Sequence, residues 1–205
     1  MIATILPRSA DFHAVGYNER KVAKGAARLI EMRNFGTLGT FGRPTADELK
    51  KYLIEYTSRN DRIRKAQFHV AISCKGHEIP ESELLELTHR YLAEMGYMEL
   101  GQPLLVYSHY DTDNTHLYVI TSRIAPDGRK IAHSHERRRS QEIIDHILGT
   151  DRKQKTDKDI ENTMQYTFFA QFKTVMSSMG YETYKKDGIV FIVKKKWFAN
   201  YTNVT

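Results

Sequence analysis

The sequence is poor in cysteine and has no long apolar run. Its 205 residues include one cysteine, Cys74, which excludes a disulfide framework and a zinc site built from cysteines. The apolar stretch at residues 2–6 is too short for the core of a signal peptide. No other apolar run reaches the roughly 18–20 residues that cross a bilayer. These absences predict a soluble protein of a reducing compartment that has no membrane partner.

The excess of positive charge is divided between the two ends of the chain. Thirty-one Lys and Arg stand against 25 Asp and Glu, a net charge of +6. Residues 1–65 and 128–205 each carry +6, whereas residues 66–127 carry −6. Basic flanks around an acidic centre suit a polyanion on the flanks and a cation among the central carboxylates. The alternative, which the charge total alone favours, is a solvated basic surface.

Strand patterns and helix patterns alternate along the chain. Residues 67–73 alternate apolar and polar side chains with the period of a strand. Thr45 and Glu48 have the spacing of a capping box at the start of a helix. We expect strands at 2–6, 67–73, 104–110 and 115–124, helices at 17–32, 45–58, 80–95, 136–148 and 160–179, and a hairpin made by 181–184 and 189–194. This order predicts an α+β fold, a central antiparallel β-sheet flanked by α-helices.

A highly charged stretch, residues 150–159, divides the chain. We therefore expect a core domain at residues 1–150. We expect residues 151–205 to form a helical segment plus a C-terminal β-hairpin that packs on the core or follows it.

One predicted hairpin gathers metal-binding side chains. His109 ends its first strand, and His116 and Tyr118, two residues apart on the second, share a face. Pairing of the strands brings His109 opposite these two. Imidazoles suit a divalent transition metal. Asp111, in the turn between the strands, can bind the metal directly or orient one of the imidazoles through its second nitrogen. His69 is a further ligand or an ordinary strand residue, and the plain alternative is a polar hairpin with two ordinary histidines.

Two segments pair basic residues with possible phosphate chemistry. Tyr17 opens a basic stretch with Lys21 and Lys24, and a tyrosine hydroxyl can attack phosphorus where cations stabilise its phenolate. Since there are twelve tyrosines, one tyrosine by itself is uninformative. The arginines at 137–139, preceded by the basic pair at 129–130, form a cationic helix entrance suited to a phosphate backbone, or simply a solvated face.

In this order the motifs resemble the relaxases of plasmid and transposon mobilization proteins, above all the Bacteroides type. These belong to the nicking-endonuclease superfamily named for a histidine–hydrophobic–histidine metal motif. The similarity is carried by residues 16–26, by 109–123 with both histidines, and by 128–140. It spans about residues 10–150, so residues 1–150 are expected to be the relaxase catalytic core.

The resemblance implies a reaction and its partners. Tyr17 would be the nucleophile of a transesterification that nicks one strand at an origin of transfer and leaves a 5′-phosphotyrosine link. His109, His116 and Tyr118 would hold a divalent metal ion, Mg²⁺ or Mn²⁺, with Asp111 also in the catalytic site. Single-stranded DNA and accessory mobilization proteins would be the partners, in the bacterial cytoplasm. The implied DNA contacts are Lys21, Lys24, Arg123, Arg137, Arg138 and Arg139.

The sequence departs from the family motif at one position. Tyr118 stands where the second histidine of the motif belongs, and tyrosine binds a metal as phenolate or, weakly, as phenol. Two alternatives to a mobilization nickase therefore stay open. One is a non-catalytic DNA-binding accessory protein with a degenerate relaxase site. The other is a replication initiator or transposase with the same chemistry, since a shared fold does not fix the pathway.

Overall fold

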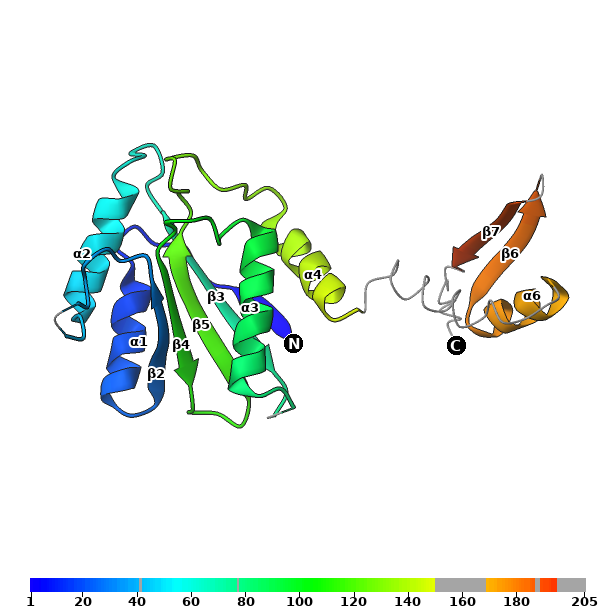
Figure 1. Ribbon diagram of the computed structural model, residues 1–205, viewed down its shortest axis with the longest axis horizontal. Helices are drawn as coiled ribbons and strands as arrows, with labels where there is room; N and C mark the ends of the chain where they lie inside the picture. Colours follow the sequence, from blue (N-terminus) through cyan, green and yellow to red (C-terminus); the bar gives the residue numbers. More distant parts are fainter. Residues whose placement is uncertain (41, 77, 150–168, 187–188, 195–205) are drawn as a thin grey trace, which may run out of the picture. The chain divides into compact units, whose positions relative to one another are not determined.

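We describe the fold from a computed structural model of the chain (Figure 1). The structure describes residues 1–40, 42–76, 78–149, 169–186 and 189–194. They fall into two compact units, Met1–Leu148 and Gly149–Thr205, which are described separately. The charged stretch expected to divide the chain, residues 150–159, lies outside the described residues. No helix in the described ranges is long and apolar enough to span a membrane.

A five-stranded sheet forms the centre of the first unit. Every neighbouring pair of strands is antiparallel, in the order β1-β3-β5-β4-β2. The strands are β1 (Ile2–Ile5), β2 (Ala27–Arg33), β3 (Gln67–Cys74), β4 (Leu104–His109) and β5 (Thr115–Ser122). The predicted α+β class with a central antiparallel sheet is confirmed, and the β4–β5 hairpin lies in the middle of that sheet.

Helices cover both faces of the sheet (Figure 1). On one face lie α1 (His13–Ala23) and α2 (Ala46–Thr57), and on the other α3 (Glu81–Met95) and α4 (Glu136–Ile147). The alternation within β3 decides which side chains meet which helices. Phe68, Val70 and Ile72 join the apolar core beneath α3 and α4, whereas His69 points to the α1–α2 face.

The helix ends follow the signals in the sequence. At the start of α2, the Thr45 hydroxyl accepts the backbone N–H of Glu48 (3.3 Å), and the Glu48 carboxylate accepts the backbone N–H of Thr45 (2.7 Å). This confirms the predicted capping box, which contributes about 1 kcal/mol to stability. At the end of α3, Gly96 takes the left-handed conformation (φ 85°) that stops a helix.

The prediction of a helix over residues 17–32 is confirmed for residues 17–23 and wrong beyond them. α1 begins at His13 and ends at Ala23, and the chain then reverses through Gly25 (φ 71°) into strand β2. A left-handed residue of this kind ends a helix readily only when it is glycine. A bulge between Leu29 and Glu31 interrupts the two-residue alternation of β2, so its apolar residues take the spacing of a helix.

The second unit contains one described helix and one hairpin. α6 (Phe169–Ser178) is the described part of the helix predicted at 160–179. β6 (Tyr181–Lys186) pairs antiparallel with β7 (Ile189–Lys194), with Tyr184 opposite Phe191. The predicted hairpin is therefore confirmed, while the tip of its turn, residues 187–188, lies outside the described residues.

Candidate active site

The central hairpin brings the two predicted histidines together. In the β4–β5 register His109 lies directly opposite His116, and Tyr107 lies opposite Tyr118. This confirms the pairing expected from the sequence. Tyr107 belongs to the core beneath α1 and α2, and Tyr118 packs against that core. His109 and His116 share this face of the hairpin with the two tyrosines, so all four side chains lie on the α1 side of the sheet.

Helix α1 positions Tyr17 over His109. The two rings are stacked, with centroids 6.2 Å apart and planes inclined by 26°. Tyr17 is 39% exposed, so its ring packs on the protein while solvent still reaches it. One helical turn later, the Lys21 ammonium lies 5.9 Å from the centre of the Tyr17 ring. An exposed tyrosine, a lysine and a buried histidine therefore lie together, with Tyr17 on the solvent side of His109.

A buried asparagine joins the helix to the hairpin. Asn18 is fully buried, its amide Nδ2 donates to the carbonyl of Ala14 (2.8 Å), and its Oδ1 lies 2.6 Å from Nε2 of His109. Because Nδ2 is the donor to Ala14, Oδ1 must accept, and His109 Nε2 carries the proton of this bond. In neutral His109 the lone pair is then on Nδ1. Asn18 was not among the site residues predicted from the sequence.

The free nitrogen of His109 faces a carboxylate. Its Nδ1 lies 3.8 Å from Oδ1 of Asp111, whose other oxygen is paired with the Lys21 ammonium. The hydrogen bond from Lys21 lowers the pKa of Asp111. Burial lowers the pKa of His109, although the charge of Asp111 opposes the shift. At neutral pH the site therefore presents a neutral imidazole beside an ionised carboxylate.

His116 and Tyr118 are less free to bind a metal. His116 Nε2 is hydrogen-bonded to the Thr112 hydroxyl (2.6 Å) in the turn. The Tyr118 ring lies against His109, with centroids 4.2 Å apart. Burial raises the pKa of Tyr118, so this side chain is a neutral phenol and a poor metal ligand at neutral pH.

The donor set fits a hydrated hard cation better than a three-histidine site. Within the described ranges, no group of three or more His, Cys, Asp or Glu side chains is arranged to hold a metal ion. The imidazole lone pair of His109 and the carboxylate of Asp111 do face one another at 3.8 Å. Mg²⁺ keeps several waters and needs only one or two carboxylates beside the substrate phosphate, so the Asp111 carboxylate fits such an ion, whereas the His109 imidazole is a donor better suited to a transition metal.

His69 lies on the same face but has a different environment. Its Nε2 is buried and has no hydrogen-bond partner among the described residues. Its ring lies 5.7 Å from that of Tyr118, which separates it from His109. Burial, followed by the charges of His13 and His109, lowers the pKa of His69 to about 4. His69 is therefore a buried neutral imidazole.

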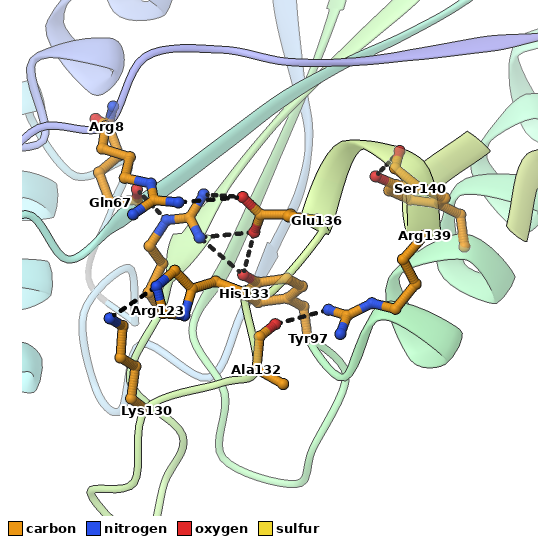
Figure 2. A network of polar contacts seen from close by, with 11 residues as sticks. Arg8, Gln67, Tyr97, Arg123, Lys130, Ala132, His133, Glu136, Arg139 and Ser140 are labelled. Atoms are coloured by element: carbon orange, nitrogen blue, oxygen red, sulfur yellow. Dashed lines mark hydrogen bonds and ion pairs between the residues drawn. The ribbon is translucent and has the colours of Figure 1, made fainter. Parts of the chain in front are cut away.

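The expectation that Arg123 contacts DNA is corrected by the structure (Figure 2). Arg123 is only 1% exposed, and its two terminal nitrogens donate to the Glu136 carboxylate at 2.6 and 3.0 Å. Its Nε donates to the carbonyl of Gln67 (3.2 Å). A phosphate cannot reach a guanidinium enclosed in this way, and Arg123 instead ties β5 to the start of α4.

The other predicted DNA contacts lie at two places on the first unit. Lys24 is exposed at the end of α1. Arg137 and Arg138 are exposed in the first turn of α4, where Arg138 pairs with Glu142 (3.3 Å). Arg139 is half-buried and donates to the carbonyl of Ala132 (2.7 Å). Lys24 and Arg137 are thus open to a ligand, Arg138 is exposed but paired with Glu142, and Arg139 also holds the loop before α4.

A solvent-exposed tyrosine stacked over an imidazole, beside an ammonium and a carboxylate, is a candidate centre for phosphoryl transfer. Comparison with protein families agrees with this class. Residues 17–149 match the family described as "Relaxase: MobA/VirD2-like, nuclease domain". The match covers more than half of the chain, and the chain belongs to this family of DNA-nicking mobilization enzymes. The family is generally metal-dependent. Neither the curated proteins nor the solved structures gave a match.

Proposed function

We propose that this relaxase nicks one strand of DNA at an origin of transfer, with Tyr17 as its nucleophile, and that it is of the Bacteroides mobilization type. The observation that carries the proposal is the stacking of the accessible Tyr17 ring over His109, with Lys21 beside it. An ammonium next to a phenol stabilises the phenolate that must develop during attack.

The reaction exchanges one phosphodiester for another. The Tyr17 oxygen forms a bond to phosphorus while the bond from phosphorus to the 3′ oxygen breaks. The products are a 5′-phosphotyrosine link and a free 3′-hydroxyl. The phenol loses one proton and the departing 3′ oxygen gains one, so the reaction has no net change in protons. Because no phosphodiester is hydrolysed, the strand can be rejoined by reversal of the same step.

His109 and Asp111 are the proposed holders of a Mg²⁺ or Mn²⁺ ion, with His116 across the hairpin as a further donor if Thr112 releases it. Such an ion, when bound, would polarise a non-bridging oxygen of the scissile phosphate. Asn18 keeps the Nδ1 lone pair of His109 directed to this place. Lys21 neutralises Asp111 in the structure and is free to turn to phosphate when an ion takes over that role.

The proposed substrate is single-stranded DNA, in the bacterial cytoplasm and in company with accessory mobilization proteins. Lys21 lies in the site itself, and Lys24, Arg137 and Arg138 are exposed cations on the same unit. Phosphate contacts of this kind give affinity that falls steeply with salt.

The test is covalent capture from a randomised pool of labelled single-stranded DNA with Mg²⁺ or Mn²⁺. Wild type should form an adduct that survives denaturation, and sequencing of the captured strands gives the nick site. Tyr17→Phe should form none. Tyr110→Phe is the matched control, because Tyr110 is also exposed (53%) at the same end of the hairpin but donates its hydroxyl to Glu81. An adduct that persists in Tyr17→Phe would refute the role of Tyr17.

A second candidate, a DNA-binding accessory protein without nicking activity, is favoured by Tyr118 alone. The phenol replaces an imidazole, and its raised pKa disfavours the phenolate ligand. This candidate predicts salt-sensitive DNA binding by wild type with no adduct under any divalent ion. If wild type does form an adduct, the captured sequence separates an origin of transfer from a replication origin or transposon end.

A further inference from the structure

A second cluster of charged side chains lies at the other end of strand β5. Arg123 follows the last residue of β5, whereas His116 is near the first. Arg8, from the segment after β1, and Lys130 and His133, from the loop before α4, gather around the Arg123–Glu136 pair (Figure 2). At about 3.3 Å per residue, the seven residue steps from His116 to Arg123 span about 23 Å along the strand.

The carboxylate at the centre of this cluster, that of Glu136, is already paired. The Glu136 carboxylate receives both terminal nitrogens of Arg123 and also the hydroxyl of Tyr97 (3.2 Å). Burial would raise the pKa of Glu136, but Arg123 outweighs it and holds that pKa below its ordinary value. Arg8 reaches the same carboxylate only at 3.6 Å, and its side chain is 41% exposed.

Lys130 differs from its neighbours in its ion pairing. Among the residues that the structure describes, no carboxylate lies within ion-pair distance of its ammonium. Its Nζ lies instead 3.2 Å from Nε2 of His133. Since an ammonium only donates, Nε2 must accept, and the proton of the neutral His133 ring is on Nδ1, where it is a donor. The cluster thus offers a guanidinium, an ammonium and an imidazole N–H.

We propose that Arg8, Lys130 and His133 form a phosphate-binding site for the DNA strand, several nucleotides from the phosphate that Tyr17 attacks. The inference rests on the proposed function, because that function supplies the polyanionic ligand. A phosphodiester carries one negative charge and only acceptor oxygens, which match these three donors. Bound there, the strand would pass from the α1–α2 face of the sheet, where Tyr17 lies, to the α3–α4 side, where Arg123 packs on Phe68 beside Glu136.

Arg129 provides a built-in control. It is the neighbour of Lys130 in sequence and its side chain is 62% exposed, but its guanidinium is paired with both Asp127 (2.5 Å) and Glu99 (2.9 Å). Its charge is therefore neutralised within the protein. Removal of Lys130 should weaken DNA binding, whereas removal of Arg129 should not.

The experiment measures single-stranded DNA affinity against salt by fluorescence anisotropy for Arg8→Ala, Lys130→Ala, the double variant and Arg129→Ala. Removal of one cation that binds phosphate should reduce the slope of log affinity against log salt by about 0.7. The slope of the double variant should therefore fall by about 1.4, and Arg129→Ala should keep the wild-type slope. An unchanged slope in the double variant, or an equal reduction in Arg129→Ala, overturns the proposal.

Two further measurements separate this inference from the proposed function. A short oligonucleotide that covers only the nick site should form the Tyr17 adduct at the wild-type rate in the double variant, while a long one should bind more weakly than to wild type. If the double variant binds the short and the long oligonucleotide equally weakly compared with wild type, the proposed phosphate site is refuted, while Tyr17 remains the proposed nucleophile. Because Lys130 is exposed and has no carboxylate partner among the described residues, Lys130→Gln gives a second, conservative variant whose fold is checked by thermal unfolding.

Discussion

The amide oxygen of Asn18 lies 2.6 Å from the Nε2 nitrogen of His109, and both side chains are buried. The bond fixes the tautomer of one residue of the site and also docks the helix that carries the adjacent residue, Tyr17. A single hydrogen bond therefore links the tautomer of the imidazole to the position of Tyr17, the proposed nucleophile.

Asn18→Leu should lower the nicking rate and destabilise the protein by about 1–3 kcal/mol, because it leaves a buried N–H of His109 without an acceptor. Asn18→Asp keeps an oxygen at that place and should retain the tautomer. The measurement is the ¹⁵N chemical shift of the two His109 nitrogens by NMR, together with the adduct rate.

The control for Asn18 is Asn60→Leu, which removes a hydrogen bond to the Gly128 carbonyl far from the site. It should affect stability but neither the His109 shifts nor the rate. If Asn18→Leu left His109 in the Nε2–H tautomer, the positioning role of Asn18 would be refuted.

His69 should make stability depend on pH in the mildly acidic range. Its pKa is about 4 in the folded protein and 6.5 when unperturbed, so between these values the unfolded chain binds the proton more readily. Stability should therefore fall as pH falls from 6.5 to 4, by about 3 kcal/mol in total. Chemical unfolding of wild type and His69→Leu across this range gives the difference.

The His69→Leu curve should be flatter than the wild-type curve by that amount. His146→Leu, which removes an exposed histidine of α4, is the control and should keep the wild-type dependence. Parallel curves for wild type and His69→Leu would contradict the assignment of a buried neutral imidazole.

Tyr118→His should raise the affinity for Mn²⁺ by about tenfold or more. The substitution replaces a phenol of raised pKa by an imidazole. The Tyr118 ring lies 4.2 Å from that of His109, measured between centroids. A neutral imidazole binds divalent ions at neutral pH without first losing a proton. Titration calorimetry with Mn²⁺ measures the change. Tyr184→His, in the second unit, should leave the affinity unchanged. An equal affinity for wild type and Tyr118→His would mean that position 118 does not face the bound ion.

Arg123→Met and Glu136→Gln should each destabilise the first unit by about 3–5 kcal/mol, since each removes the ionic partner of a buried charge. The double variant should cost clearly less than the sum, because no isolated charge remains. Urea unfolding gives these values. The salt slope of DNA binding should be the same in Glu136→Gln as in wild type. If the free energies lost in the two single variants simply add up in the double variant, Arg123 and Glu136 do not stabilise the protein through their interaction with one another.

The register of the central hairpin was predictable because the alternation along β4 and β5 and the short polar turn allow one pairing that buries the apolar face. The capping box of α2 was predictable for a similar reason, since both partners lie within four residues. Each is a local pattern, and its consequence does not depend on the rest of the fold.

The features that escaped prediction are set by partners far away in sequence. Asn18 gains its role from His109, 91 positions later, and nothing in its own neighbourhood marks it. The resemblance implies Arg123 as a DNA contact, but neither the motif nor the sequence around it shows that the guanidinium is buried beside Glu136. The strand β2 was assigned to a helix because its bulge and its pairing with β4 are tertiary properties.

The strand order has a consequence for when the enzyme becomes active. β1 and β2 are the two outer strands of the sheet, and α1, with Tyr17, is part of the connection between them. The histidines belong to the hairpin in the middle. Tyr17 lies over His109 only when α1 is packed on that hairpin. If Tyr17 is the nucleophile, nicking activity should therefore appear only in chains in which the connection between the two outer strands has packed on the middle of the sheet.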